Sequence, residues 1–215
     1  MNNFNPSYYA NARREIEPLL PPNIGSVLEI GCSEGNTLLW LRDDKHIKTC
    51  RGIEILPDVA ARAKEKGLDI VVADIEHDGI PFKDQYDLVL CLDVLEHLRD
   101  PWSALKVITE SIRPGGYFIA SIPNITHISI LSDLILRDRF DYVESGILDK
   151  THLRFFTGTT ARQLLTDARL EVIQQKPRFA RKTHRRLNFL TMGLFKRFFT
   201  FQTLLLATRK DHAAT

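Results

Sequence analysis

The chain has few cysteines and no long hydrophobic segment. Its three cysteines, Cys32, Cys50 and Cys91, form no CxxC pair and no zinc-site spacing. This pattern predicts structural thiols in a reducing compartment. No apolar run is long enough to span a membrane. The first residues lack the basic and apolar regions of a secretory signal, so we expect a cytoplasmic protein.

An excess of charge of one sign is also lacking. The 215 residues carry 29 Lys and Arg against 27 Asp and Glu, and the net charge of +2 is too small to indicate nucleic-acid binding by itself. A hydrophobic content of 44% is typical of a globular protein, and a chain of this length can bury a sizeable core. We therefore expect a single domain over residues 1–215.

Short apolar runs alternate with helical patterns along the chain. The predicted strands cover residues 27–30, 49–54, 68–74, 86–93, 117–122, 170–174 and 201–208. The predicted helices cover residues 8–17, 58–66, 101–112, 126–139 and 159–168, and another begins near residue 37. Nearly continuous apolar strands that alternate with helices indicate a parallel sheet covered on both faces.

The first four predicted strands each end in or beside a carboxylate. These residues are Glu29, Glu54, Asp74 and Asp93. Ligands bind sheets of this kind outside the carboxyl ends of the strands. Four carboxylates at one edge suggest a ligand rich in donors, such as an ammonium, ribose hydroxyls and an exocyclic amine. Glu54 also lies about 20 residues beyond the first glycine turn, where a ribose-binding carboxylate is expected.

That glycine turn follows the first strand. Gly31 and Gly35 allow a sharp turn and a close approach to a ligand, and the next helix offers backbone N–H groups. Asn36 stands where a GxGxxG pattern would end, and no GxxxxGK[ST] loop is present. Glu34 inside the turn would also repel a pyrophosphate. The turn therefore disfavours dinucleotides and triphosphates, and an ordinary strand–helix turn remains the alternative.

Five segments, taken in order, resemble the class I S-adenosylmethionine-dependent methyltransferases, and in particular their ubiquinone-biosynthesis O-methyltransferase branch. They read VLEIGCSEG, GIE, ADI, YDLVLCLDVLEHLRDP and RPGGYFIASIPN. The resemblance covers a core of about residues 8–175 and departs from the usual motif at Ser33, where the family has glycine. It implies a Rossmann-like α/β fold: a doubly wound, seven-stranded, mostly parallel sheet with the last strand antiparallel and helices on both faces.

The resemblance also implies the cofactor S-adenosyl-L-methionine, with S-adenosyl-L-homocysteine as product. The cofactor-binding residues carried over are Glu29, Gly31, Cys32, Gly35, Glu54, Ile55, Asp74, Ile75 and Leu92. Glu29 and the glycine turn would hold the methionine part, and Glu54 would accept from both ribose hydroxyls. Asp74 would accept from the adenine amine, and Leu92 would contact the region near the sulfonium.

Two histidines are candidates for a catalytic base, because imidazole accepts protons near neutral pH. His97 follows the fourth strand, and His152 lies in the loop at residues 141–156, where the resemblance places the acceptor pocket. Either histidine could instead hold its loop in place. His127 and Tyr142 are weaker candidates.

Three residues near the fourth strand raise the question of a metal. Asp93, Glu96 and His97 stand where the ubiquinone-biosynthesis O-methyltransferases have an acid, acid and histidine set implicated in divalent-metal binding. The same letters occur widely in methyltransferases without metal, so we assign no metal ligand.

Residues 176–200 form a basic insert before the last strand. The chain has no acidic residue between Glu171 and Asp211. Basic residues beside an apolar helix suggest peripheral contact with an anionic lipid surface or a phosphorylated ligand. A solvated linker, with a helix packed on the core or a second subunit, is narrowly favoured. DNA is not expected, because an NPPY-like motif is absent.

The sequence therefore predicts a methyltransferase with a small-molecule acceptor, and an oxygen of a sugar, glycolipid or related metabolite is favoured. The alternatives are an RNA or protein methyltransferase, a cofactor-binding partner protein without turnover, and a nicotinamide-dependent oxidoreductase. The oligomeric state stays open.

Overall fold

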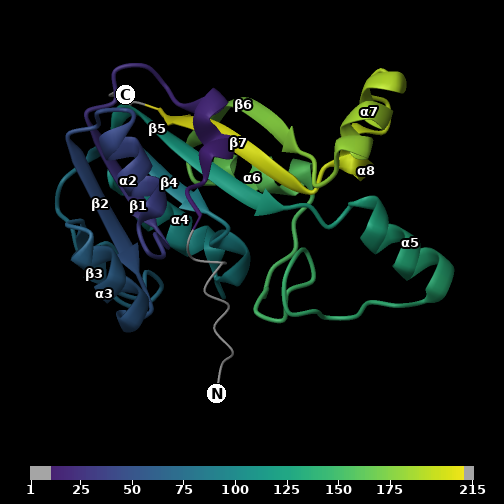
Figure 1. Ribbon diagram of the computed structural model, residues 1–215, viewed down its shortest axis with the longest axis horizontal. Coiled ribbons are helices and arrows are strands. Elements are labelled where there is room, and N and C mark those ends of the chain that lie inside the picture. Colours follow the sequence, from purple (N-terminus) through teal and green to yellow (C-terminus); the bar gives the residue numbers. More distant parts are fainter. Residues whose placement is uncertain (1–10, 211–215) are drawn as a thin grey trace.

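Seven strands form one mixed sheet in the computed structural model, which describes residues 11–210 (Figure 1). The strands are β1 (Ser26–Ile30), β2 (Thr49–Glu54), β3 (Asp69–Val72), β4 (Tyr86–Leu92), β5 (Ile112–Pro123), β6 (Leu170–Arg178) and β7 (Gln202–Arg209). Their order is β3-β2-β1-β4-β5-β7-β6. Strand β7 lies between β5 and β6 and is antiparallel to both, whereas the pairs among β1 to β5 are parallel. The predicted fold class is confirmed.

Helices cover both faces of this sheet. The 3₁₀-helix η1 (Arg14–Leu19) and the helices α2 (Asn36–Asp43) and α3 (Pro57–Glu65) pack on one face. The helices α4 (Pro101–Glu110) and α6 (Gly158–Asp167) pack on the other. Successive residues of β1 serve opposite cores, since Val27 packs with α2 and Leu28 with α4. This burial on both faces explains why the strands read as continuous apolar runs.

The sheet changes direction beside β1. The chain passes from β1 to β2 and β3 on one side and then returns to β4 on the other. Doubly wound sheets bind ligands outside the carboxyl ends of their strands, at such a switch point. The edge formed by the ends of β3, β2, β1 and β4 is therefore the place to look for a site.

Additional elements extend beyond the ends of β5 and β7. They are α5 (Ile128–Arg137), α7 (Lys182–Leu190) and α8 (Lys196–Phe199), with the loop at residues 141–156 between α5 and α6. Figure 1 shows α5 and α7 projecting from the sheet on the same side. A short 3₁₀-helix, η2 (Leu95–His97), follows β4.

Several predicted boundaries are wrong, and the strand predicted over residues 117–122 already begins at Ile112. The helix predicted over residues 8–17 is instead the 3₁₀-helix η1, which continues through Pro18; residues 8–10 lie outside the described range. A proline lacks the N–H of an α-helical bond, which favours the shorter structure. Strand β6 extends to Arg178 instead of ending at residue 174, so the basic insert begins inside the sheet. Helix α4 ends at Glu110, since β5 already begins at Ile112.

Within residues 11–210 there is no helix with the length and apolar character needed to cross a membrane.

Candidate functional site

Four carboxylates lie along one edge of the sheet. Glu54 is the last residue of β2, Glu29 is the penultimate residue of β1, and Asp93 directly follows β4. Asp74 lies two residues beyond β3, which pairs with β2 through Glu54 and Val72. The strand order therefore brings the four predicted carboxylates to the carboxyl edge in the sequence Asp74, Glu54, Glu29 and Asp93.

The turn after β1 is tightly packed. Gly31 and Gly35 have φ values of +67° and +73°, and Ser33 between them has φ of +52°. Residues other than glycine rarely adopt this left-handed backbone conformation. A Cβ at Gly31 would also lie 2.5 Å from Val94 Cγ2, and one at Gly35 would lie 2.2 Å from Leu68 Cδ1. Both glycines are thus required by conformation and by space.

The N–H groups of this turn are engaged within the protein. Gly31 and Cys32 both donate to the carbonyl of Ile53, and Gly35 donates to the carbonyl of Cys32. The Ser33 N–H donates to Glu54 Oε2 at 2.9 Å. In this conformation these N–H groups of the turn are therefore bonded within the protein.

Glu54 holds the turn and remains able to accept more hydrogen bonds. Its Oε2 accepts from Ser33, and its Oε1 accepts from the Leu56 N–H at 3.0 Å. It is 5% exposed. A carboxylate has about four lone-pair sites, so each oxygen of Glu54 can still accept from a ribose hydroxyl.

The Glu29 carboxyl is buried and has a raised pKa. Its Oε2 has no hydrogen-bond partner among the described residues. Burial raises the pKa of this carboxyl to about 8, although Arg13 and a hydrogen bond from Thr37 act to lower it. A cationic ligand group would compensate the buried negative charge.

The other predicted cofactor residues occupy varied environments. Asp74 Oδ1 accepts from the Glu76 N–H at 2.9 Å, and Ile75 beside it is buried. Ile55 is 56% exposed just after β2, and Leu92 is buried at the end of β4. Ile55 is therefore the most accessible of these four positions.

The negative charge of Glu34 in the glycine turn is paired within the protein. Its carboxylate pairs with Arg62 at 2.8 Å and Lys66 at 3.3 Å, both from the region of α3. These cations neutralise the charge that was expected to repel a pyrophosphate. The missing third glycine is therefore the feature of this turn that still disfavours a dinucleotide.

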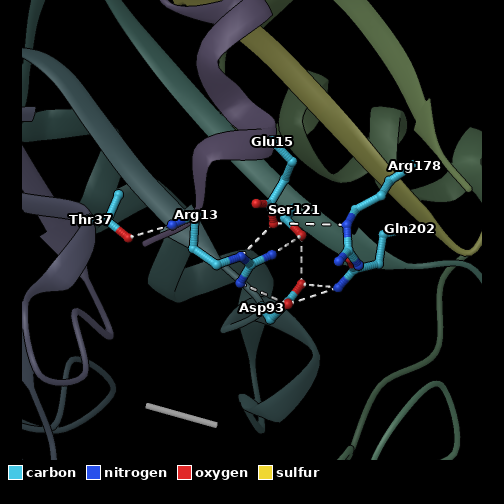
Figure 2. Close-up of polar contacts among 7 residues, drawn as sticks. All are labelled: Arg13, Glu15, Thr37, Asp93, Ser121, Arg178 and Gln202. Carbon is cyan, nitrogen blue, oxygen red and sulfur yellow. Dashed lines mark hydrogen bonds and ion pairs between the residues drawn. The ribbon is translucent and has the colours of Figure 1, made fainter. Parts of the chain in front are cut away.

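Asp93 is the centre of a polar network that the sequence did not reveal (Figure 2). It pairs with Arg13 at 2.9 Å and accepts hydrogen bonds from Ser121 Oγ and Gln202 Nε2. Arg13 also pairs with Glu15. These partners come from the N-terminal segment, β5 and β7. Arg13 falls in the helix predicted over residues 8–17, and no local pattern signals its contact with a residue 80 positions away.

Two histidines and a glutamate form a compact cluster beyond β4. One potential ligand atom from each of Glu96, His97 and His152 lies within 4.8 Å of the others. The two imidazole centroids are 4.7 Å apart. The backbone carbonyl of Glu96 accepts from the N–H groups of Leu153 and Arg154, which anchors the loop at residues 141–156 on η2. The structure thus brings the two predicted catalytic histidines together.

The hydrogen bonds of this cluster define its chemistry. His97 Nδ1 lies 3.2 Å from the carbonyl of Thr151, and His152 Nδ1 lies 2.9 Å from the carbonyl of Ile147. A carbonyl only accepts, so each Nδ1 carries the proton and each Nε2 keeps a lone pair. Both carboxylate oxygens of Glu96 are buried without a hydrogen-bond partner among the residues that the structure describes, and burial followed by the charge of Asp93 raises the pKa of Glu96.

Asp93 does not join this cluster. The acid, acid and histidine set would combine Asp93 with Glu96 and His97, but the three grouped residues are Glu96, His97 and His152. Asp93 has φ of +57° and faces Arg13 and Gln202 instead. This metal set, raised by the resemblance, is therefore not assembled.

Aromatic side chains flank His152. Phe155 lies 6.5 Å from its ring, and Phe140 and Tyr142 lie 5.8 Å and 6.3 Å from Phe155. Phe140 is 39% exposed and Tyr142 is 50% exposed. These rings form a partly open apolar surface beside the histidine pair. The weaker candidate His127 is buried elsewhere, at the start of α5.

The three cysteines are free thiols in or beside the core. Burial raises the pKa of Cys32 and Cys91, and it raises the pKa of Cys50 to about 11. Thiols of this kind are unreactive at neutral pH. Cys32 Sγ would meet a Cβ at Gly52 at 2.5 Å, which places it between β1 and β2 as a packing group.

Residues 2–175 match the family model for a methyltransferase domain. The chain therefore belongs to the S-adenosylmethionine-dependent methyltransferase family. S-adenosylmethionine is the cofactor of this family of enzymes and S-adenosylhomocysteine is the product, so the predicted family and cofactor are confirmed.

Curated relatives of this methyltransferase match part of it. The ubiquinone biosynthesis O-methyltransferase of Aeromonas salmonicida (strain A449) is 35% identical over 101 residues, which are 45% of this chain and 42% of that protein. The corresponding protein of Escherichia coli O127:H6 is 31% identical over 94 residues, which are 42% of this chain and 39% of that protein. The match thus spans about two fifths of the length of these relatives.

Solved structures share the fold of this methyltransferase at low identity. An S-adenosylmethionine-dependent methyltransferase from Archaeoglobus fulgidus superposes with a TM-score of 0.63 at 19% identity, covering 95% of this chain and 94% of that one. One from Mesorhizobium loti gives a TM-score of 0.63 at 16% identity, covering 94% of this chain and all of that one. These likenesses support the fold alone.

Proposed function

We propose that this protein transfers a methyl group from S-adenosylmethionine to an oxygen of a small-molecule acceptor, such as a sugar, glycolipid or related metabolite. The observation that carries this proposal is the cluster of Glu96, His97 and His152 next to the carboxylate edge. The carboxylate edge would hold the methyl donor, and the neighbouring cluster offers groups that can accept a proton from an acceptor hydroxyl.

The carboxylate edge and Arg13 suit the cofactor's functional groups. Glu29 would face the ammonium, Glu54 the ribose hydroxyls and Asp74 the adenine amine. Gly31, Cys32 and Gly35 would line the methionine part, and Ile55, Ile75 and Leu92 would complete the contacts. Arg13, held beside the edge by Asp93, supplies a guanidinium for the cofactor's carboxylate.

His97 and His152 would remove the proton from the acceptor. S-adenosylmethionine supplies the methyl group by displacement at its sulfonium. Each histidine holds its Nδ1 proton on a backbone carbonyl, which leaves Nε2 ready to accept. The rings of Phe140, Tyr142 and Phe155 would orient an apolar or ring-shaped acceptor beside them.

A labelled-methyl assay tests this function. Purified protein and labelled cofactor are mixed with cell extract, which is then separated into lipid, aqueous small-molecule and precipitable fractions. Protein-dependent label in either of the first two fractions is expected. Label confined to the precipitate would indicate an RNA or protein acceptor, and cofactor binding without label in any fraction would favour a binding protein.

Histidine variants test the mechanism once an acceptor is found. We expect His97→Asn and His152→Asn each to lower kcat by about 10²- to 10⁴-fold, the usual contribution of a positioned base. The dissociation constant for S-adenosylhomocysteine should stay unchanged. His46→Asn, at an exposed position, is the matched control. Unchanged kcat in both site variants would contradict the proposed base.

The same cluster supports a second candidate role as a divalent-metal site. Two imidazole Nε2 atoms and an unpartnered buried carboxylate fit the donor set that first-row divalent metals prefer. Glu96, His97 and His152 would hold the ion, and a bound ion would lower the pKa of a coordinated hydroxyl. Asp93 would take no part.

Metal removal distinguishes the two roles. Metal content and melting temperature are measured after chelation and again after Zn²⁺ or Mn²⁺ is restored. A metal site predicts one bound ion in the wild type, none in Glu96→Gln, and a rise in melting temperature on restoration only in the wild type. Transfer activity that survives chelation would favour the histidine base alone.

A further inference from the structure

A cavity of about 290 Å³ lies between α5 and α7. The first turn of α5 contributes Ser129, α7 contributes His184, and Arg181 precedes α7 as its N-cap. Phe201 closes the cavity at the start of β7. The next residue, Gln202, donates to Asp93. The chain therefore links the cavity to the Asp93 network through consecutive residues, while the cavity itself is lined by other residues.

Two residues that line this cavity have buried polar atoms without a hydrogen-bond partner among residues 11–210. These atoms are His127 Nε2 and His184 Nδ1. The Ser129 N–H donates to His127 Nδ1 at 3.3 Å. That nitrogen is therefore an acceptor, and Nε2 carries the proton of the neutral ring. His127 is 4% exposed, so its Nε2–H is a buried donor that lacks an acceptor.

Such a donor indicates a ligand, because an unsatisfied buried donor costs about 1–3 kcal/mol. The neighbouring rings hold the donor in place: His127 lies edge-on to Phe201 at 5.7 Å, and His184 stacks on Phe199 at 5.6 Å. Asn124 Nδ2 also donates to the carbonyl of Thr200, which links the start of the α5 region to β7. The geometry is thus formed before any ligand binds.

The cavity is electropositive. Helices α5 and α7 both begin at its walls and present the positive ends of their dipoles. Arg181 adds a guanidinium, and no Asp or Glu is among the lining residues. Burial, with help from the charges of His184 and Arg181, lowers the pKa of His127 to about 4. Burial disfavours charge of either sign, so the preference for an anion comes from Arg181 and from the two helix N-termini.

We propose that this cavity binds a phosphate group, as a monoester or diester. The phosphate oxygens would accept from His127 Nε2–H and from the Arg181 guanidinium, and the Ser132 hydroxyl in the cavity wall already donates to the carbonyl of Ser129. The phosphate would belong to the methyl acceptor, because Phe201 in the cavity wall directly precedes Gln202, which donates to Asp93; this last step rests on the proposed function.

Exposed apolar side chains lie towards the C-terminal ends of the same two helices and in the turn after α7. They are Ile135 and Leu136 in α5, Phe189 and Leu190 in α7, and Met192 and Leu194 beyond α7, all of them 74–95% exposed. Figure 1 shows α5 and α7 projecting together beyond the sheet. A hydrocarbon chain attached to the phosphate would find apolar surface there, so the phosphate of a lipid is one source and a soluble phosphate ester is the other.

Direct titrations test the site without a methyl acceptor. Inorganic phosphate and glycerol phosphate are titrated by calorimetry, and phosphatidylcholine vesicles with or without phosphatidic acid are tested by cosedimentation. The variants are Arg181→Met, which removes the lining charge, and Arg185→Met, which removes the same charge from an exposed position of α7. Binding of S-adenosylhomocysteine verifies that each variant is folded.

We expect saturable binding of at least one phosphate probe, at least tenfold weaker in Arg181→Met and changed less than about twofold in Arg185→Met. A response to the soluble probes identifies a soluble ester, and a response to phosphatidic acid vesicles alone identifies a lipid phosphate. No binding of any probe, or equal weakening in both variants, would overturn the proposal. Because these titrations need no methyl transfer, a failed transfer assay leaves their result intact.

Discussion

Glu54 has two roles at the scale of single residues. Its oxygens accept the N–H groups of Ser33 and Leu56 and so fix the turn against which the cofactor would lie. The predicted ribose contact adds to this task instead of competing with it, because a carboxylate accepts more than two hydrogen bonds.

Replacement of Glu54 should therefore weaken cofactor binding. We expect Glu54→Ala to raise the dissociation constant for S-adenosylhomocysteine about tenfold or more, since a charged hydrogen bond is lost and the turn is loosened. Calorimetric titration measures this effect. The exposed Glu65→Ala on α3 is the control, and an unchanged constant in Glu54→Ala would remove the ribose assignment.

Glu29 predicts a pH dependence of cofactor affinity. Its pKa is raised to about 8, so the free protein holds a proton there below that pH. A bound ammonium needs the ionised carboxylate, so binding releases the proton and affinity rises as pH increases from 6 towards 8, by at most about tenfold per unit. The raised pKa also affects folding stability. Protonated Glu29 contributes to the free energy of unfolding at low pH, and this contribution is lost as pH rises towards 8.

Titrations of S-adenosylhomocysteine at several pH values between 6 and 8 measure this dependence. In Glu29→Gln the affinity should be weaker and nearly independent of pH over this range. An equal slope in the variant would show that another group titrates.

At the scale of elements, the turn between β1 and α2 depends on close packing as well as on conformation. Gly35 and Gly67 have nearly the same φ, +73° and +74°. A Cβ at Gly35 would lie 2.2 Å from Leu68 Cδ1, whereas a Cβ at Gly67 would meet nothing within 4 Å. The two positions therefore separate backbone strain from steric conflict.

We expect Gly67→Ala to cost about 1 kcal/mol of unfolding free energy and Gly35→Ala to cost about 1–3 kcal/mol more. Chemical denaturation measures both values, and titration with S-adenosylhomocysteine should show weaker binding only in Gly35→Ala. Equal stability of the two variants would mean that Leu68 moves aside without cost.

Sequence periodicity predicts the elements of this protein better than their contacts. Continuous apolar runs locate the central strands β1 and β4 because these strands are buried on both faces, whereas the edge strand β6 is mostly exposed and its apolar run is short. The ends are less well predicted: β6 extends to Arg178 because it pairs with β7 through Gln202. That pairing depends on a strand which the chain reaches only after α7 and α8.

The candidate site shows the same contrast between local patterns, which the sequence predicts, and long-range contacts, which it does not. Acidic strand ends and the glycine turn are local patterns, and the topology of a parallel sheet brings them to one edge. The contact of Asp93 with Arg13 and Gln202 joins residues that are 80 or more positions apart and carry no local signature. Likewise, the sequence suggested Asp93 as a partner of His97, whereas the loop at residues 141–156 supplies His152 in its place.

At the scale of the whole molecule, the Asp93 network connects parts of the chain that are far apart in sequence (Figure 2). Arg13 joins the N-terminal segment to the end of β4, and Gln202 joins the start of β7 to the same carboxylate. Arg178 in β6 contacts both Glu15 and Gln202. The candidate site is therefore formed only when the first and last described segments are both in place.

Removal of Arg13 should affect both stability and binding. In Arg13→Met the carboxylate of Asp93 loses its cation in a partly buried setting, where the Arg13 side chain is 23% exposed. We expect a loss of about 1–3 kcal/mol of unfolding free energy, which lowers the melting temperature by about 2–4 °C per kcal/mol for a chain of this size. Weaker binding of S-adenosylhomocysteine should accompany it, because its carboxylate loses a partner.

Arg14→Met is the matched control, since the neighbouring Arg14 pairs with Asp44 on the surface, where the two side chains are 62% and 50% exposed. An ion pair of this kind contributes little, so its removal should leave melting temperature and binding nearly unchanged. If both variants melt alike but only Arg13→Met loses affinity, Arg13 contacts the cofactor without holding the fold together. If neither property separates them, the N-terminal segment does not form part of the site.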